Sequence, residues 1–423
     1  MANSFSKEER VAFELLLEGF NDQLVLSNAV NVFRNDQTMM ARTNDIIWRP
    51  QPYIALSYQG LDQTANFKDQ TQLSVPAAIN NFRSSPFQMT ALELRDALQE
   101  GRLGDAAKQK LASDINVAVT NTASLQGTLV VKRTTAASGF DDLAQCDSIM
   151  NEQGIMNGDR YAGFNSRDYN SMASNLAGRQ TMNELPMTAY EKALVARNVS
   201  GFDVLKMDYG VRLTAAAGTG VTITGANQFY TPAATTTDVN GGGVNVDNRY
   251  QTVGITVTGG TVKVGDAFTI QGVNAVHHIT KVDTGQLKTF RITAIVTGAG
   301  GTGTVQISPP IISGQGATVA ELQYQNVTAT PAAGAPITFM NTVSSIVNPF
   351  WRKDAIELLP GRIEYPNDAG WSIIRGSTDQ GLEIVMVKQG SILSGKVLYR
   401  VDTYFGTNMT QPEMSGIELF NQT

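Results

Sequence analysis

The chain has very little charge in one long internal stretch, and this absence is its most informative feature. Residues 214–345 contain only 10 of the chain's 70 Asp, Glu, Lys and Arg residues. The same stretch contains 19 of the 39 glycines and 25 threonines. The segments on both sides resemble each other in composition and differ from this stretch. The pattern therefore predicts a β-domain inserted into a different host fold, at a site where the chain ends lie close together.

Residues that bind metals or act as nucleophiles are also scarce. The single cysteine, Cys146, excludes an internal disulfide, and a buried thiol is the ordinary interpretation of such a residue. His277 and His278 are the only histidines; on a strand, adjacent side chains point to opposite faces and do not share a metal. We therefore expect no catalytic residues, no metal site and no cofactor, although a pair of glycosidase carboxylates is not visible from spacing alone.

Long apolar runs are missing as well. No window approaches the roughly 18 apolar residues of a membrane-spanning helix, so we expect no contact with a membrane. Glu14 and Glu18 interrupt the only apolar segment near the N-terminus, which argues against a signal peptide and predicts synthesis in a reducing cytoplasm. The net charge of -6 gives no general affinity for nucleic acid, because coating DNA requires clustered Lys and Arg.

The flanking parts of the chain alternate between helical and extended patterns. Residues 6–34 are predicted to form an amphipathic helical arm, packed on its own domain or reaching a neighbouring subunit. Residues 50–82 show a polar pattern that predicts a long two-stranded excursion, which needs a partner surface because a lone hairpin is marginally stable. Helical spacing then predicts a short helix that Gly101 and Gly104 separate from a main helix at 105–126.

Short strands are predicted in the rest of the chain. Residues 128–212 alternate between strands and helices, and strands return after Asn348. In the charge-poor stretch, Gly, Pro and Asn recur at the spacing of a small barrel or sandwich. The segment 298–303 matches a glycine-rich phosphate pattern, but the strands on both sides predict a hairpin turn. Six strands are predicted there, within 219–232, 249–260, 265–272, 289–298, 303–310 and 320–329.

Two arginines beside tryptophans are candidates for ion pairs between subunits. Arg49 lies between Trp48 and Pro50, and Arg352 follows Trp351. Solvated charges are the ordinary interpretation of such residues, so both interpretations stand.

Several quoted segments carry a family resemblance. VTITGANQFYTP, VNVDNRYQTVGITVT and KVGDAFTIQGV lie in the charge-poor stretch, and NPFWRKDAIELLP and YFGTNMTQPEMSGIEL follow it. In order and spacing they resemble the major capsid (coat) proteins of tailed bacteriophages with the HK97-type fold, and more narrowly those of the P22 group. The likeness covers nearly the whole chain. NVDNRY and FWRKDAI are its most specific parts, because they bracket the insert where the family brackets it.

The resemblance implies an α+β chain with the HK97-like capsid fold and an inserted all-β barrel, the I-domain. The implied parts are a peripheral P-domain with a long spine helix, an A-domain at the capsomer centre, an N-arm, and an E-loop lying across the adjacent subunit. The implied boundaries are 1–37 for the N-arm; 38–127 for the E-loop (50–82) and the P-domain with its spine helix (105–126); 128–213 for the first part of the A-domain; 214–345 for the I-domain with a D-loop at 235–249; and 346–423 for the return strands of the A- and P-domains.

The resemblance also implies contacts for particular residues. The N-arm of the family binds a scaffolding protein, and the D-loop reaches across two-fold axes. This D-loop carries less charge than those of its relatives, and no covalent cross-link is assigned to Lys68. The implied contact residues are Glu14 and Glu18 in the N-arm, Asp238, Asn240 and Gly242 in the D-loop, Arg49 and Lys68 in the E-loop region, and Arg352.

These implications predict a structural coat protein rather than an enzyme. Its expected partners are copies of itself in pentamers and hexamers of an icosahedral shell, a scaffolding protein, a portal protein, and packaged double-stranded DNA enclosed without sequence-specific binding. It is expected to assemble in the bacterial cytoplasm and to end in the virion. Two other hypotheses remain open at this point: a sugar-binding or tail-fibre subunit whose β-insert recognises glycans, and a hydrolase with a hidden carboxylate pair.

Overall fold

The computed structural model of the chain contains two compact units. The first comprises the described residues of Met1–Ile47, Ala77–Val119 and Ile356–Asn408, and the second those of Trp48–Pro76, Thr120–Ala355 and Met409–Thr423. The residues that the structure describes are 10–11, 13–14, 16–17, 24–33, 46–90, 97–179, 199–316, 318–366 and 370–423.

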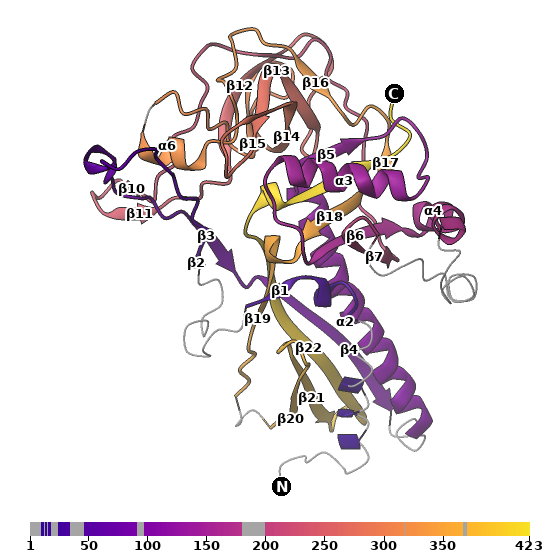
Figure 1. The fold of residues 1–423 in the computed structure, drawn as a ribbon. Helices are drawn as coiled ribbons and strands as arrows, with labels where there is room; N and C mark the ends of the chain where they lie inside the picture. The colour runs from indigo at the N-terminus through magenta and orange to yellow at the C-terminus, as the bar shows by residue number, and fades with distance from the viewer. Residues whose placement is uncertain are drawn as a thin grey trace. The chain divides into compact units, whose positions relative to one another are not determined.

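A six-stranded sheet is the main β-structure of the first unit (Figure 1). Its order is β1-β19-β22-β21-β20, and β4 also pairs with β22. Phe87 of β4 stacks on Tyr399 of β22, with 5.2 Å between the ring centroids. The strands predicted after Asn348 are therefore confirmed. Their bounds are β1 (Asn31–Val32), β4 (Asn81–Thr90), β19 (Ile356–Pro360), β20 (Ser372–Ser377), β21 (Glu383–Ser391) and β22 (Lys396–Met409).

The main helix, α2 (Ala97–Gln126), is one continuous element of 30 residues, so the predicted break at Gly101 and Gly104 is wrong. Each glycine inside a helix costs only about 1 kcal/mol, and burial of one face offsets this cost. That face repeats at helical spacing from Ala107 through Leu111 to Ile115. The predicted end is confirmed, because Gly127 directly follows the helix and its amide donates to the Ala123 carbonyl at 3.2 Å.

A five-stranded sheet of order β5-β23-β18-β6-β7 forms the core of the second unit. β18 lies antiparallel to both β23 and β6, whereas β5 and β7 run parallel to β23 and β6. The alternation of strands and helices predicted for 128–212 is confirmed where the structure describes it. The elements within 128–212 are β5 (Leu129–Lys132), α3 (Phe140–Glu152), β6 (Arg160–Asn165), α4 (Ser166–Arg179) and β7 (Phe202–Met207). The later part of the chain adds the strands β18 (Asn348–Arg352) and β23 (Ser415–Leu419) to the sheet.

Cys146 lies in the hydrophobic core beside this sheet, as the ordinary interpretation predicts. It is buried and packs in one cluster with Leu143 and Phe350. Burial, with Glu418 and Asp142 nearby, raises the pKa of its thiol well above the ordinary value. A thiol that is buried and protonated is a poor nucleophile.

The charge-poor stretch, called the insert below (residues 214–345), leaves and re-enters the second unit at one place. β8 (Arg212–Leu213) ends directly before the insert, and β17 (Ser345–Ile346) begins at its last residue. The two strands pair antiparallel, with Leu213 opposite Ser345. The two ends of the insert therefore lie side by side, as a domain insertion requires.

The insert folds into a six-stranded barrel of order β16-β13-β14-β15-β12-β9. A bridge between Thr222 and Pro336 links the two ends of this order. Residues 298–303 connect β14 to β15 and form part of their hairpin, which confirms the predicted turn. The strands are β9 (Thr222–Ile223), β12 (Gln251–Val257), β13 (Ala267–Val276), β14 (Asp283–Thr297), β15 (Gly301–Ser308) and β16 (Ile337–Phe339).

The sixth predicted strand, within 320–329, is wrong, because this segment begins with a helix, α6 (Val319–Tyr324). Thr318 caps the helix, its hydroxyl accepting from the Glu321 amide at 3.2 Å. The Glu321 carboxylate in turn accepts from the Gly316 amide at 2.6 Å. A Ser or Thr three residues before an acid is a helix-start signal, which the alternating apolar residues of the segment obscured. β16 takes the sixth place.

We expect the insert to fold as an isolated fragment of residues 214–345. Its core of buried aliphatic and aromatic side chains comes entirely from residues 221–339, so the fragment keeps the apolar contacts that stabilise the barrel. The fragment should give a dispersed NMR spectrum and a cooperative thermal transition. Phe290→Asp, which places a charge in the barrel core, should abolish both. A random-coil spectrum of the unaltered fragment would contradict the expectation.

Candidate functional site

The sequence-predicted contact residues that the structure describes belong to four segments of the chain: the N-terminal segment, the loop at 50–82 with its flanking strand, the hairpin of the insert, and the segment that contains Arg352. Within the described stretches of the chain, no three His, Cys, Asp or Glu side chains lie close enough to hold a metal ion. Among the same residues, no helix is both long and apolar enough to cross a membrane.

A short hairpin within the insert brings Asp238, Asn240 and Gly242 together in one turn. It consists of β10 (Thr235–Thr237) and β11 (Gly243–Asn245), which pair antiparallel and are exposed at every residue. Asp238 Oδ1 accepts from the amides of Asn240 at 2.8 Å and Gly242 at 2.9 Å. Part of the Asp238 carboxylate thus holds its own turn. Val239 at the tip is fully exposed.

The loop that the sequence predicts as an excursion at 50–82 is largely irregular. Only its flanks are strands, β2 (Ile46–Pro50) and β3 (Ser74–Ala78), which form a two-stranded sheet. The predicted partner surface lies partly within the chain, on the insert. Tyr324 donates its hydroxyl to the Thr71 carbonyl at 2.8 Å, and Leu73 packs against Tyr324 and Ile312.

The predicted residues of this loop differ in exposure. Arg49 is half-buried in β2, whereas Lys68 is exposed near the middle of the loop. Leu61 and Phe67 are exposed large apolar side chains on either side of a short 3-10 helix (Thr64–Asn66). The loop therefore presents apolar groups that its own chain does not cover.

Arg352 has a partner in its own chain. Its guanidinium lies 3.3 Å from the carboxylate of Asp354, which is exposed. An ion pair between subunits stays a prediction for this residue.

The N-terminal segment presents Glu14 on an exposed helical face. Phe13 and Leu16 are buried in the first unit, and Phe13 lies against Gly376 of β20. One face of the segment is therefore packed on its own unit, and the opposite face carries the acid. Glu18 lies outside the described residues.

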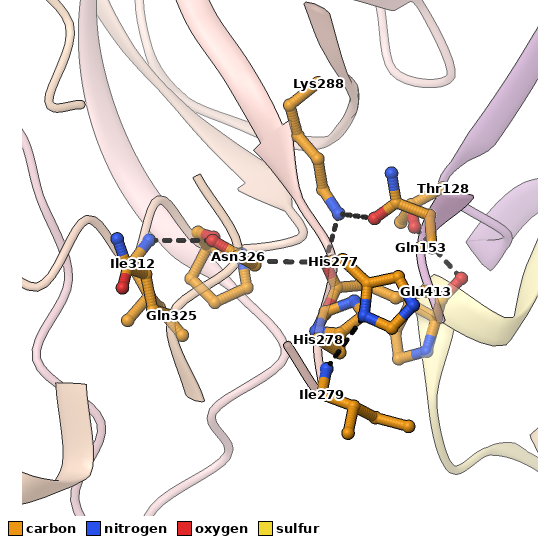
Figure 2. A network of polar contacts seen from close by, with 12 residues as sticks. Thr128, Gln153, His277, His278, Ile279, Lys288, Ile312, Gln325, Asn326 and Glu413 are labelled. Atoms are coloured by element: carbon orange, nitrogen blue, oxygen red, sulfur yellow. Dashed lines mark hydrogen bonds and ion pairs between the residues drawn. The ribbon is translucent and has the colours of Figure 1, made fainter. Parts of the chain in front are cut away.

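A buried polar cluster that sequence reasoning missed joins the insert to the five-stranded core of the second unit; it is called the seam below (Figure 2). Lys288 of β14 forms an ion pair with Glu413 at 2.6 Å and donates to Gln153 Oε1 at 2.8 Å. Asn326 donates to the same Glu413 oxygen at 3.1 Å. The His278 amide donates to the Gln153 carbonyl at 3.1 Å. The insert thus places a buried cation against a carboxylate of the C-terminal segment.

The charges of the seam determine its protonation. Burial alone would raise the pKa of Glu413, but Lys288, His278 and two hydrogen bonds lower it to about 2. Burial is the main cause that lowers the pKa of His278 to about 4. Glu413 opposes this shift, whereas the positive charges of Lys288 and Lys281 add to it. At neutral pH the seam therefore holds an ionised Glu413 and a neutral His278.

A second buried contact joins the insert to the end of α2. Arg291 donates to the carbonyls of Ser124 and Gly127, and its other terminal nitrogen donates to the Gly265 carbonyl at 3.1 Å. The adjacent Thr289 hydroxyl donates to the Thr128 carbonyl at 2.8 Å. A cation at the last carbonyls of a helix is favoured by their partial negative charge. No spacing signal in the sequence connects these residues.

These elements define a class of protein. The elements are a long helix, a six-stranded sheet in the first unit, a five-stranded sheet with two helices, an inserted barrel and exposed loops. Together they form the HK97-like fold of tailed-phage major capsid proteins. The family model of the P22 coat protein (gene protein 5) matches residues 1–421, so the chain belongs to that family. Its members are structural capsid proteins and not enzymes, which excludes the hydrolase and the tail-fibre hypotheses.

Solved structures of other proteins are also similar to this chain. One from Mycobacterium phage Che8 is 10% identical, with a TM-score of 0.46, and the match covers 94% of this chain and 92% of that chain. The CUS-3 coat protein I-domain is 43% identical, with a TM-score of 0.23, over 30% of this chain and 98% of that chain. The capsid of Cyanophage P-SCSP1u is 9% identical, with a TM-score of 0.40, over 93% and 86%.

Family membership gives the coarse function. The chain is a major capsid protein that assembles with copies of itself into an icosahedral shell, and it is therefore a component of the virion.

Proposed function

We propose that this subunit assembles with a scaffolding protein and a portal protein, in the bacterial cytoplasm, into a precursor shell that matures as it encloses double-stranded DNA. The observation that supports this proposal best is the set of exposed segments that find little support within their own chain, above all the hairpin 235–245. Such segments become ordered when many modest interfaces form at once. The net charge of -6 suits an enclosing shell that makes no sequence-specific contact with DNA.

We assign the domains by combining the resemblance with the observed sheets. The P-domain comprises the first unit's sheet and the part of α2 within that unit, and the A-domain comprises the five-stranded sheet. Within 346–423, β18 and β23 then belong to the A-domain and β19 to β22 to the P-domain. The insert is the I-domain.

Four contacts between molecules follow from this assignment. The N-arm binds the scaffolding protein through Glu14 and Glu18, because Glu14 faces solvent while its apolar neighbours are buried. A basic helix of the scaffold is the complementary partner. The E-loop, with Arg49 and Lys68, lies across the adjacent subunit and covers Leu61 and Phe67, since exposed apolar groups favour an interface.

The D-loop (235–249) joins neighbouring capsomers. Because Asp238 already binds two amides of its own turn, the contact uses the tip as a whole, including Asn240, Gly242 and Val239. Arg352, with its exposed partner Asp354, supplies a further charged contact between subunits.

Hydrogen exchange measured by mass spectrometry tests these contacts in one experiment. Residues 50–82 and 235–249 should exchange fast in the free subunit and more slowly in shells, because the shell covers them. Residues 6–34 should be protected when scaffold is added, and Glu14→Gln with Glu18→Gln should remove that protection. The control Glu364→Gln, at an exposed acid of the first unit, should leave it unchanged. Equal exchange in the free subunit and in shells would contradict the proposal.

A further inference from the structure

No residue of the hairpin 235–245 is buried by the rest of the chain. All residues of β10 and β11 are exposed, and the tip residue Val239 is fully exposed. Gly241 in the turn has a φ of +83°, and its neighbours Gly242 and Gly243 add further freedom. A two-stranded hairpin is marginally stable by itself. The direction in which it projects must therefore be set where it leaves the barrel, at its base.

Asn248 holds the base together. It is 5% exposed, and its side chain connects the segment before the hairpin to the segment after it. Its Oδ1 accepts from the Tyr230 hydroxyl at 3.0 Å and from the Ala233 amide at 3.1 Å. Its Nδ2 donates to the carbonyls of Ala233 at 2.9 Å and Val246 at 3.0 Å. The amide thus uses both its acceptor and its donor, a combination that neither Asp nor Ala reproduces.

Arg249 ties the same base to a different part of the second unit. Its Nε and one terminal nitrogen donate to the Asp247 carboxylate at 2.9 Å and 2.7 Å. Its other terminal nitrogen donates to the Met409 carbonyl at 2.8 Å. Asp247 itself forms a parallel bridge with Ser74. Residues 247–249 therefore connect the hairpin base to segments that come from far along the chain.

We propose that Asn248 and Arg249 are positioning residues: they fix the direction of the hairpin so that its tip meets a second copy of this chain in the neighbouring capsomer. This inference rests on the proposed contact of the D-loop between capsomers. Neither side chain belongs to the exposed tip. They act by restricting the free hairpin to the orientation that the contact needs, which lowers the entropic cost of association.

The first test measures the direction of the hairpin in the free subunit. Nitroxide labels on Val239→Cys and Val296→Cys, both at exposed positions, report the distance between tip and barrel by electron spin resonance. Cys146 is buried and should remain unlabelled. The distance distribution should be narrow in the parent and broader in Asn248→Ala. Val305→Ala, a cavity in the barrel core, is the control for lost stability and should leave the distribution narrow.

The second test measures the lowest subunit concentration at which shells form, well below the melting temperature. Asn248→Ala should raise this concentration about tenfold, because it should weaken the affinity between subunits by about the same factor. Asn248→Asp keeps the acceptor oxygen but turns a carboxylate toward the carbonyls of Ala233 and Val246, so it should not restore the parent value. Val305→Ala should change the concentration little. If Asn248→Ala leaves the distance distribution narrow, or affects assembly no more than Val305→Ala, the positioning role is wrong.

A tip variant separates this inference from the proposed contact on which it rests. Val239→Asp changes only a fully exposed side chain, so it leaves the base and the fold intact. If Val239→Asp raises the assembly concentration and Asn248→Ala does not, the contact stands and the positioning role fails. If Val239→Asp assembles like the parent, the contact itself fails and the inference fails with it.

Discussion

Replacing Glu413 with glutamine is expected to lower the free energy of unfolding at pH 7 by about 3–5 kcal/mol, the usual cost of breaking a buried ion pair on one side. Lys288 is 1% exposed at its side chain and lies 2.6 Å from Glu413. The substitution preserves the volume of the side chain but leaves the Lys288 ammonium buried without its counter-charge. Urea denaturation measures the change in the free energy of unfolding. Spectroscopic probes placed in the insert and in the five-stranded sheet should both report this change.

A matched control makes this expectation specific. Glu364→Gln makes the same chemical change at an exposed acid that pairs with Arg362 and Arg375, and it should cost less than about 1 kcal/mol. The double variant Lys288→Met with Glu413→Gln should recover part of the loss, because it removes the buried cation together with its partner. Equal effects of Glu413→Gln and Glu364→Gln would contradict the structural role of the seam.

Acid is expected to destabilise the protein first through His278. Its pKa falls from 6.5 in a solvated imidazole to about 4 in the folded chain. The unfolded chain therefore binds a proton between these pH values while the folded chain does not, and stability falls as the pH falls through this window. At about 1.4 kcal/mol for each pH unit, the loss reaches about 3 kcal/mol. Glu413, with its pKa lowered to about 2, adds a further loss below pH 4.5.

A variant that changes no titratable group provides the control for this pH dependence. His278→Gln should make the loss of stability between pH 6.5 and 4 smaller than in the parent, measured by urea denaturation at a series of pH values; the raised pKa values of Glu418 and Asp266 act in the opposite direction and are common to both proteins. Val305→Ala removes buried methyl groups of the barrel core and no titratable group, so it should lower the stability by a similar amount at every pH and keep the slope. If the slope survives unchanged in His278→Gln, another group causes it and the account of the seam is wrong.

Much of the fold is predictable from local pattern. The strands at 251–257 and 301–308, the hairpin turn between β14 and β15, and the end of α2 at Gly127 all follow from periodicity and glycine placement. Two predictions failed where a tertiary contact or a capping signal decided the outcome. Burial carried α2 through Gly101 and Gly104, and the Thr318 cap turned a predicted strand into α6.

The contact residues were predictable only in part. The spacing within TTTDVNGGGVN places Asp238 and Gly242 in one turn, because a glycine-rich turn flanked by threonines is a hairpin signal. The pairing of Lys288 with Glu413 was not predictable, since 124 residues separate them in the sequence and no periodicity relates them. Asn248 lies in the NVDNRY segment, but only the structure shows that its side chain joins both sides of the hairpin base.

Several of the few charged residues in the insert form its contacts with the rest of the second unit. Three of its few charged residues connect it to the rest of the second unit: Arg249 binds the Met409 carbonyl, Lys288 pairs with Glu413, and Arg291 binds the end of α2. A fourth, Asp238, holds the exposed tip. The insert therefore uses much of its limited charge to fix its own position, and the contact that it offers to other molecules is mainly uncharged.

The most direct test of this account is electron cryo-microscopy of shells assembled from the full chain, at a resolution that traces the hairpin 235–245. The account predicts that the tip around Val239 meets a second copy of the chain across the boundary between two capsomers, with Asn248 and Arg249 at its base uninvolved in that contact. A hairpin that projects into solvent in every subunit of the shell, without touching another copy, would contradict it.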